Sequence, residues 1–402
     1  MSIFRHGYVA GPILGLLWAL VIATTTAVVF SFATGGAFRP GGIGAGLLGA
    51  GLGALAVLWP RLAGPVGLGL GALMSLTPLA PVVTGPDIAA TTALLAGGVM
   101  GAATGWPIAA MMAGCHSGAL TRHEFEASVI RFLTGFGYIF FTAIVAIPFY
   151  VMVMTSLKNQ SELIQNPLDF SIDLSKGWDL FRSYSELFGQ FNFGSYLWTS
   201  FLVSVLTVFI TLLFAVPGAY AVARLRFAGR AAISRSILLI YMVPMIVLAL
   251  PIYIAFSMLG LRNSIFGIVM IYPVTTIPVA LYMLQGYFRG LPAEIEEAGL
   301  MDGLSRLKVI WQITLPLSMP ALASVSLYVF MIAWNEFLLA FMLLDDPSKF
   351  TLTRGIAALN SSEIPRQHLM AGSVIATVPI MALFLGLERF MTKGLTAGSV
   401  KG

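Results

Sequence analysis

The sequence contains few charged residues and a single cysteine. Of its 402 residues, 10% are Asp, Glu, Lys or Arg, whereas 58% are hydrophobic and the mean hydropathy is +0.91. Soluble domains are typically about half apolar and about a quarter charged. The shortage of charge therefore excludes an ordinary soluble domain and indicates a polytopic integral membrane protein.

Missing motifs narrow the classes of function further. Because Cys115 is the only cysteine, neither an intramolecular disulfide nor a multi-cysteine zinc site can form. The four histidines are scattered without metal-ligand spacing, and we expect no metal site. The sequence also lacks the Walker A pattern, the GxSxG elbow and the HExxH motif. We therefore expect no cofactor bound by this chain, and no nucleic-acid partner.

What the sequence does contain is a series of long apolar segments. A helix needs about 20 residues to cross roughly 30 Å of hydrocarbon, and such segments must be helical because lipid leaves no partner for free backbone groups. Ten windows are long enough. They lie at 8–33, 42–60, 63–85, 88–114, 132–155, 196–222, 234–258, 263–287, 318–343 and 368–391. The sequence thus predicts an all-α membrane protein with about ten transmembrane helices.

The first window begins after a short basic N-terminus, which is typical of a signal peptide. However, the apolar run continues from Tyr8 to about Ala33, whereas the apolar region of a cleavable signal peptide has roughly 7 to 15 residues. We therefore expect a retained first span.

The distribution of basic residues predicts the orientation in the membrane. With a cytoplasmic N-terminus, 14 of the 22 Lys and Arg residues fall in cytoplasmic segments and the other 8 fall outside. The segment 223–235 alone carries four arginines and no acidic residue. By the positive-inside rule, we expect both termini on the cytoplasmic side of a bacterial inner membrane.

Residues 42–114 are dominated by glycine and alanine. Small residues let membrane helices approach closely, so this region could form compact helical hairpins or a dimerisation surface. A tolerated extension packed against the periphery is an equally good interpretation. The polar stretch 115–131 is the natural boundary, and it predicts an N-terminal extension of about four transmembrane helices, 1–129, before a second domain, 130–402.

The longest polar loop lies between Ser156 and Thr199. It carries five acidic and three basic residues, with aromatic residues interleaved. A solvated loop with an aromatic belt at the membrane interface explains this composition. Contact with a soluble partner that carries substrate is the alternative.

A charged, amphipathic segment, 291–316, separates two of the later apolar windows. Pro292 suits the first turn of a helix, where its missing N–H would have no partner. Glu294, Glu296 and Glu297 complement the positive end of the helix dipole. The pattern predicts a short helix from about Pro292 to Met301.

A turn and a second short helix are predicted to follow. Asp302 and Gly303 favour the turn, since glycine adopts positive φ without strain. Ser305 can cap a helix that runs to about Thr314, and Pro316 limits its continuation. The segment is therefore predicted to fold as a compact knob of two short helices. An unstructured connecting loop would not require these caps and turn residues.

Within this segment, seven residues carry a family resemblance. The sequence resembles the permeases of binding-protein-dependent ABC importers, whose signature is EAA-x3-G-x9-I-x-L-P. Gly299 stands where Ala is usual and lowers helix propensity by about 1 kcal/mol. The seven signature positions are occupied by Glu297, Ala298, Gly299, Gly303, Ile313, Leu315 and Pro316, and all but Gly299 have the usual residue.

Three other stretches are similar to the carbohydrate subgroup of this family, and specifically to the second permease of maltose-type systems. They are 218–230, 333–340 and 387–402. The resemblance covers roughly 130–402 and implies a six-helix type I importer permease core, preceded by a four-helix Gly/Ala-rich extension to which nothing in the family corresponds.

The resemblance also implies partners. Such permeases pair with a homologous permease, rest on two ATPase subunits that bind ATP and Mg, and receive sugar from an extracytoplasmic binding protein; lipid surrounds them. The loop 290–316 would dock in a cleft of the ATPase, with Glu297 facing a basic group and Gly303 permitting close backbone approach. The candidate coupling residues are Glu296, Glu297, Ala298, Gly299, Asp302, Gly303, Ile313, Leu315 and Pro316.

Two further sets of candidate residues follow. Gly398 and Lys401 lie in a small, flexible tail that is either a frayed terminus or, by the resemblance, reaches toward the ATPase pair. Trp334, Asn335 and Glu336 are candidates for the translocation path.

Glu336 is the one clear acidic residue inside an apolar window, and a buried carboxylate in a membrane is costly and often functional. A substrate contact, a hydrogen bond with Asn335 and a position near the outer interface are all open. We favour a structural or interface role over direct sugar binding, and Trp334 is more typical of packing than of sugar stacking.

Two other classes of function compete with a permease subunit of an ATP-driven sugar importer. A secondary transporter driven by an ion gradient predicts charged residues at mid-membrane and inverted repeats, which we do not see. A membrane scaffold or sensor is favoured only if residues 1–129 carry the function. The sequence favours the importer subunit, which is a transport protein and not an enzyme.

Overall fold

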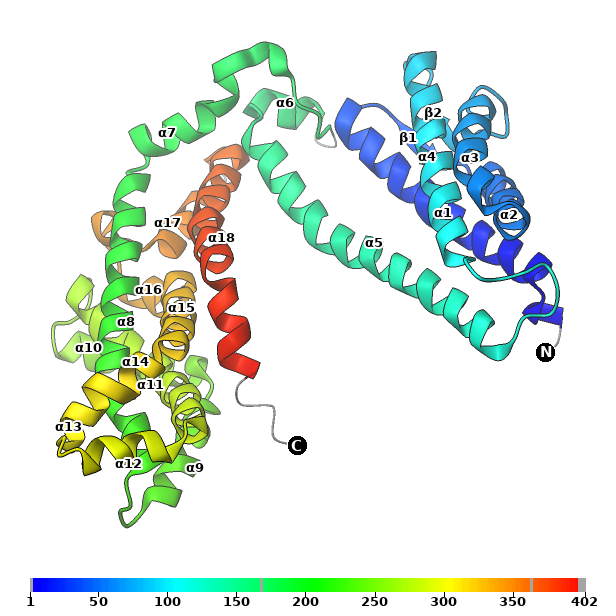
Figure 1. Ribbon diagram of the computed structural model, residues 1–402. Coiled ribbons are helices and arrows are strands. Elements are labelled where there is room, and N and C mark those ends of the chain that lie inside the picture. Colours follow the sequence, from blue (N-terminus) through cyan, green and yellow to red (C-terminus); the bar gives the residue numbers. More distant parts are fainter. Residues whose placement is uncertain (1–2, 167–168, 362–363, 397–402) are drawn as a thin grey trace. The chain divides into compact units, whose positions relative to one another are not determined.

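The computed structural model describes residues 3–166, 169–361 and 364–396 (Figure 1). The chain divides into two compact units, unit 1 with residues 1–180 and unit 2 with residues 181–402. This division differs from the predicted domain boundary at 129/130. The helix that follows that boundary belongs to unit 1 by its contacts, and the boundary itself stays a prediction.

Unit 1 consists of helices and one small sheet. Four helices come first, with a strand in each of two connections, and the long helix α5 follows. The elements are η1 (Ile3–Arg5), α1 (Gly7–Thr34), β1 (Phe38–Pro40), α2 (Gly42–Leu58), α3 (Pro60–Met74), β2 (Val82–Thr84), α4 (Ala90–Met111), α5 (Arg122–Ser156), α6 (Gln160–Gln165) and η2 (Leu174–Phe181), the last of which ends at the unit boundary.

Glycines bring the helices of unit 1 into backbone contact. A β-carbon added to Gly15 of α1 would lie 2.2 Å from the carbonyl oxygen of Gly49 in α2, and one added to Gly71 of α3 would lie 2.2 Å from that of Gly97 in α4. No larger residue fits at these positions without separating the helices. The Gly/Ala-rich sequence therefore forms two close helical hairpins, α1–α2 and α3–α4.

The two hairpins have the same helix–strand–helix order and are joined to each other. Strands β1 and β2 pair antiparallel, with Phe38 opposite Thr84. The indole Nε1 of Trp18 in α1 donates a hydrogen bond to the carbonyl oxygen of Ala103 in α4, at 3.1 Å. These contacts make the first four helices one packed body.

Helix α5 starts at a well-defined cap. Thr121 accepts a hydrogen bond from the backbone N–H of Glu124, whose side chain in turn accepts one from Thr121, so the two form a capping box. Its 35 residues make α5 long enough to cross a membrane with some tilt. The helix begins ten residues before the apolar window 132–155, because the cap precedes the apolar run.

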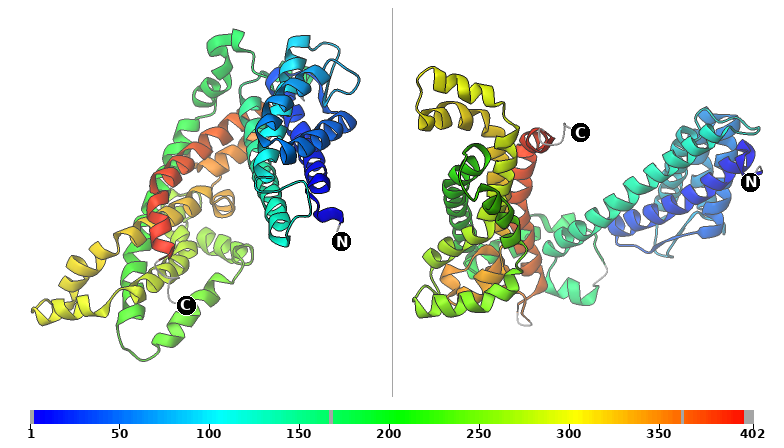
Figure 2. Two further views of the ribbon diagram at one scale, coloured as in Figure 1. Left: turned by 45° about the vertical axis from the view of Figure 1, so that its right-hand side comes forward. Right: turned by 90° about the horizontal axis from the view of Figure 1, so that it is seen from below.

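Unit 2 holds the remaining helices, and four long ones form its bundle. Helix α8 packs against α11 and α15, and α15 packs against α18. The elements are α7 (Arg182–Gln190), α8 (Phe193–Arg224), α9 (Arg230–Tyr241), α10 (Met245–Met258), α11 (Ile265–Gly290), α12 (Ala293–Met301), α13 (Arg306–Val309), the π-helical segment η3 (Ile310–Thr314), α14 (Leu315–Leu317), α15 (Met319–Asn335), α16 (Leu338–Leu343), η4 (Pro347–Lys349), α17 (Leu352–Leu359) and α18 (Arg366–Thr396). Figure 2 shows the yellow helices α12–α14 extending beyond one end of this bundle.

Within the described residues, six helices are long and apolar enough to cross a membrane: α1, α4, α5, α8, α11 and α18. The number becomes seven if Arg306–Leu317 and Met319–Asn335, which meet at an angle of 75°, count as one broken span. The predicted ten is therefore not confirmed.

Two of the predicted windows, 42–60 and 63–85, fall on helices of 17 and 15 residues; the longer would measure about 26 Å. The window 234–258 is divided into α9 and α10, because Pro244 adopts an extended conformation between them.

Candidate functional site

The charged segment between α11 and α15 folds as two short helices, as its sequence predicts. Helix α12 spans Ala293–Met301, and Pro292 precedes it in an extended conformation with ψ 126°. The predicted helix, Pro292 to Met301, is one residue longer. Glu294 and Glu296 lie in the first turn, where negative charge stabilises the helix.

The predicted turn is present at Asp302 and Gly303. Gly303 has φ +83°, which glycine adopts without the steric cost paid by other residues. The N–H of Leu304 donates to the carbonyl oxygen of Gly299 at 3.1 Å, which closes the end of α12.

The second helix continues three residues further than expected. Ser305 caps it by accepting from the N–H of Lys308, but the helix passes through a π-helical segment, Ile310–Thr314, into α14. Pro316 is tolerated because it lies in the first turn of α14, where its missing N–H costs nothing. Pro316 therefore does not end the helix. The chain bends at Ser318 instead, before α15 begins.

Glu296 is the one acidic residue of α12 that points into the protein. Its carboxylate accepts hydrogen bonds from the hydroxyls of Tyr220, at 3.1 Å, and Thr314, at 3.0 Å. Arg224 Nε lies 3.4 Å from Glu296 Oε1. Tyr220 and Arg224 belong to α8, so Glu296 fastens the loop to the bundle.

Five of the other candidate coupling residues lie on the outside: Glu297, Ala298, Asp302, Gly303 and Pro316. Gly299 is buried against the second helix, and Ile313 and Leu315 are half-buried. The structure thus divides the signature into an exposed acidic side and a packed side.

Four large apolar side chains on the same segment are also exposed, among them Ile295 at 42%, and the sequence reasoning selected none of them as coupling residues. Met301 is 88% exposed, and Leu307 and Trp311 are each 71% exposed. The sequence signal that could have identified them is the presence of large apolar side chains in a polar loop. Exposed apolar surface with charged neighbours is typical of a protein-binding site.

The translocation-path candidates have packing and capping roles in this conformation. Trp334 is 4% exposed and donates from Nε1 to the carbonyl oxygen of Ala376 in α18, at 3.1 Å. It also stacks on Phe330, with ring centroids 5.5 Å apart. Trp334 therefore joins α15 to α18.

Glu336 caps the short helix α16. Its carboxylate oxygens accept from the backbone N–H groups of Leu339, at 2.8 Å, and Ala340, at 3.1 Å. Asn335 does not supply the bond considered for Glu336, since its amide donates to the carbonyl oxygen of Met331, at 2.9 Å. Glu336 thus caps α16, and its assignment to the translocation path stays a prediction.

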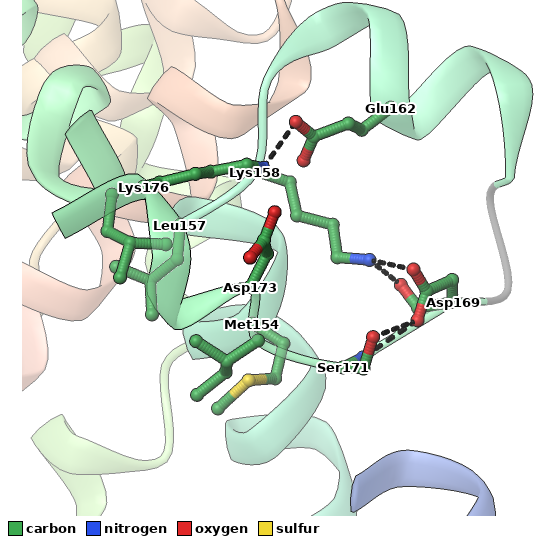
Figure 3. A pocket seen from close by; sticks show the side chains of 10 residues that line it. Met154, Leu157, Lys158, Glu162, Asp169, Ser171, Asp173 and Lys176 are labelled. Carbon is green, nitrogen blue, oxygen red and sulfur yellow. Dashed lines mark hydrogen bonds and ion pairs between the residues drawn. The ribbon is translucent and has the colours of Figure 1, made fainter. Parts of the chain in front are cut away.

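The polar loop after α5 surrounds a charged cavity of about 230 Å³ (Figure 3). Lys158 Nζ lies 2.9 Å from Asp169 Oδ2, and Lys176 pairs with Glu162. Burial alone would raise the pKa of Asp169, but hydrogen bonds from Ser171 and Lys158 hold it below the ordinary value. Each ammonium group thus has a carboxylate within the loop, which fits a loop folded on itself; contact with a soluble partner stays a prediction.

The two candidate residues of the C-terminal tail, Gly398 and Lys401, lie outside the described residues. Among the residues that the structure describes, no group of three or more His, Cys, Asp or Glu side chains could hold a metal ion.

Comparison with known proteins identifies relatives of this architecture. Residues 215–396 match the family described as "Binding-protein-dependent transport system inner membrane component". The charged segment 291–316 lies inside this range.

Curated relatives match along almost their whole length. The chain is 39% identical to the inner membrane ABC transporter permease protein YcjP of Escherichia coli, over 66% of this chain and 95% of that protein. It is 34% identical to the trehalose/maltose transport system permease protein MalG of Thermococcus litoralis, over 69% and 99%. The arabinooligosaccharides transport system permease protein AraQ of Halalkalibacterium halodurans is 30% identical, over 68% and 98%.

A solved structure has the same fold. A chain in the crystal structure of a bacterial ABC transporter involved in the import of the acidic polysaccharide alginate aligns with a TM-score of 0.57 and 22% identity. The alignment covers 67% of this chain and 98% of that one. In the alignments with these three relatives and with this structure, about a third of the present chain is not covered.

Proposed function

Because this chain belongs to the family of binding-protein-dependent transport system inner membrane components, we propose that it is the permease subunit of an ATP-driven sugar importer. The chain is a multi-pass inner-membrane protein that acts as a transport subunit, and it is not an enzyme. ATP and Mg are bound by a separate ATPase, and this chain supplies half of the translocation path.

A carbohydrate substrate is supported by the relatives. The Thermococcus litoralis protein is named for trehalose and maltose, and the Halalkalibacterium halodurans protein for arabino-oligosaccharides. These two curated relatives are similar to the chain over nearly their full lengths and support a sugar or an oligosaccharide as the substrate class. Which sugar is carried depends also on the partner permease and on the binding protein.

The observation that carries the coupling role is the geometry of the segment 291–316. Its two helices join at a tight turn, and Glu297 and Asp302 are exposed beside the apolar side chains of Met301, Leu307 and Trp311. This surface has the shape and chemistry to dock in an ATPase cleft, with Glu297 against a basic group. A rigid knob is required because coupling needs an element whose position differs between two global states.

The remaining features of the proposal concern topology and partners. Both termini are cytoplasmic, ten spans cross the membrane, and residues 1–129 form a four-helix extension of the core. The complex contains a homologous permease, two ATPase subunits and an extracytoplasmic sugar-binding protein. The charge distribution supports the orientation, and the Gly-mediated hairpins of unit 1 support the extension.

The test is ATP-driven sugar uptake by the reconstituted complex. With the wild-type chain, the ATPase should co-purify and uptake should require ATP. Glu297→Lys should abolish uptake and ATPase binding without changing membrane insertion, because it puts a positive charge opposite the expected basic group. Uptake by the chain in the absence of any ATPase, driven by an ion gradient, would instead favour a secondary transporter.

A further inference from the structure

Glu296 stands directly before the family signature and has a different environment from its neighbours. The exposed fractions of the Glu296 and Arg224 side chains are 11% and 13%. Tyr220 and Thr314 donate hydrogen bonds to the two carboxylate oxygens of Glu296. A carboxylate buried in this way is stable only when it is paired and hydrogen-bonded.

The groups around Glu296 come from three parts of unit 2. Tyr220 and Arg224 are in the last turns of α8, Glu296 is in α12, and Thr314 ends the π-helical segment. One carboxylate therefore connects both halves of the segment 291–316, called the coupling loop below, to a long helix of the bundle. No other acidic residue of α12 is buried.

Arg224 makes a second attachment to the same loop. Its Nη2 donates to the carbonyl oxygen of Leu291, at 2.6 Å, and Leu291 is the residue directly after α11. The planar guanidinium thus forms an ion pair with Glu296 through Nε and a hydrogen bond with Leu291 through Nη2, a geometry that a lysine ammonium on a flexible stem would reproduce less well. Arg224 thus holds the entry to the loop as well as its first helix.

Helix α8 is firmly set in the bundle. The ring of Tyr220 packs edge-on against Phe288 of α11, with centroids 6.1 Å apart. Further along the helix, the hydroxyls of Thr211 and Thr276 lie 2.6 Å apart in the buried contact between α8 and α11. A displacement of the last turn of α8 therefore has to move these packed helices with it.

The chain on either side of α12 provides little stiffness of its own. Pro292 is extended before the helix, and Gly303 has positive φ after it. Without the carboxylate of Glu296, α12 would keep its packing against the second short helix but would lose its charged attachment to α8. The connection between the loop and the bundle depends on the side chains.

We propose that the Glu296–Arg224 pair passes the displacement of the coupling loop to α8, so that ATPase closure moves the bundle. Glu296 and Arg224 are positioning residues that touch neither sugar nor ATP. The proposal rests on the function proposed above and adds to it the route by which motion leaves the loop.

The experiment uses the complete complex in lipid vesicles and measures sugar uptake and ATP hydrolysis in the same sample. Glu296→Arg and Arg224→Glu should each retain the ATPase but lower the uptake per ATP hydrolysed by about tenfold, within the usual range of coupling effects. The double variant, Arg224→Glu with Glu296→Arg, should recover most of the loss. Glu294→Arg, an exposed position in the first turn of the same helix, is the matched control and should couple normally.

A milder variant covers the case in which charge reversal prevents folding. Glu296→Gln keeps the shape and removes the ion pair. Its amide oxygen can accept from only one of the Tyr220 and Thr314 hydroxyls, and its NH2 group would donate to the other. This variant should lower uptake per ATP to an intermediate value. Normal uptake per ATP in Glu296→Gln and in the folded charge-reversed variants would overturn the proposal. If the wild-type complex neither holds an ATPase nor transports sugar with ATP, the proposed function itself fails, which is a different result.

Discussion

A β-carbon built on Gly299 of α12 would lie 2.6 Å from Cδ1 of Ile313 in the π-helical segment. The two halves of the coupling loop thus meet most closely at the one signature position where this chain has glycine in place of the usual alanine. The sequence suggested a cost to helix stability there. The structure adds a compensating contact, because glycine lets the two helices pack together.

This contact predicts a size limit at position 299. Gly299→Ala should leave ATP-driven uptake within about twofold of wild type. The gain of about 1 kcal/mol in helix propensity is offset by a shift of the Ile313 side chain, about 0.5–1.5 kcal/mol. Gly299→Leu should cost about 1–3 kcal/mol by overpacking and reduce both ATPase binding and uptake. Gly286→Leu in α11, which has open space beside it, is the control, and equal loss in both leucine variants would contradict the prediction.

The turn at Gly303 predicts a different order of substitutions. Its φ of +83° lies in the left-handed region, where a residue with a β-carbon costs about 1–2 kcal/mol. The space around it is open, so conformation and not size decides. Uptake should fall from wild type through Gly303→Asn and Gly303→Ala to Gly303→Val, since asparagine tolerates left-handed backbone. If Gly303→Val were as active as Gly303→Asn, the turn would not need this geometry.

Trp334 allows packing to be distinguished from substrate contact. Trp334→Ala should destabilise the protein by about 3–5 kcal/mol, as large-to-small core changes do, because it removes the contacts with Phe330 and Ala376. The apparent KM for sugar of the folded fraction should stay unchanged. Trp198→Ala, at a side chain that is 64% exposed, is the control for loss of an indole. A KM changed more than about tenfold, or about 1.4 kcal/mol, with normal protein yield would place Trp334 in the translocation path.

In unit 1, helix α2 contains two glycines that form a matched pair for substitution. A β-carbon on Gly49 would lie 2.3 Å from the carbonyl oxygen of Gly15, whereas one on Gly51 would meet nothing within 4 Å. Gly49→Ile should therefore cost at least about 1–3 kcal/mol by forcing α1 and α2 apart, and Gly51→Ile should be nearly neutral. Thermal unfolding of the full chain in detergent measures the difference. Equal unfolding temperatures would mean that the close approach of the hairpin is not required.

The lowered pKa of the Glu186 carboxyl predicts how the stability of the protein depends on pH. Arg182 first, and then His368, hold the pKa of Glu186 below its ordinary value of 4.5 by hydrogen bonding. Since the folded pKa is lower than the unfolded one, the stabilisation is present above pH 4.5 and is lost as the pH falls through the folded value.

The measurement compares unfolding temperatures of wild type and Glu186→Gln. The wild type should be more stable at neutral pH, and the difference should vanish under acid conditions. The exposed Asp179, changed to Asn, is the control and should show a smaller difference. A Glu186→Gln difference that does not change with pH would contradict the assignment of the effect to this carboxylate.

Much of the coupling loop could be predicted from the sequence because local interactions determine it. The Pro292 boundary, the turn at Gly303 and the cap at Ser305 each depend on residues within five positions of one another. The second helix was predicted three residues too short, since a proline acts as a breaker only in a helix interior and Pro316 lies in a first turn. The number of spans is less certain from sequence, because apolar composition does not reveal where a helix ends.

The sequence by itself thus determined the class of the protein, the coupling loop and the family, because hydropathy, caps and signature spacing are properties of neighbouring residues. Only the tertiary structure decided that Glu296 turns inward, since its partner Tyr220 is 76 residues away. The same holds for Trp334, whose partner Ala376 is 42 residues away. Contacts at such separations depend on how α8, α15 and α18 pack, and helix packing is fixed by side-chain shape across the whole bundle.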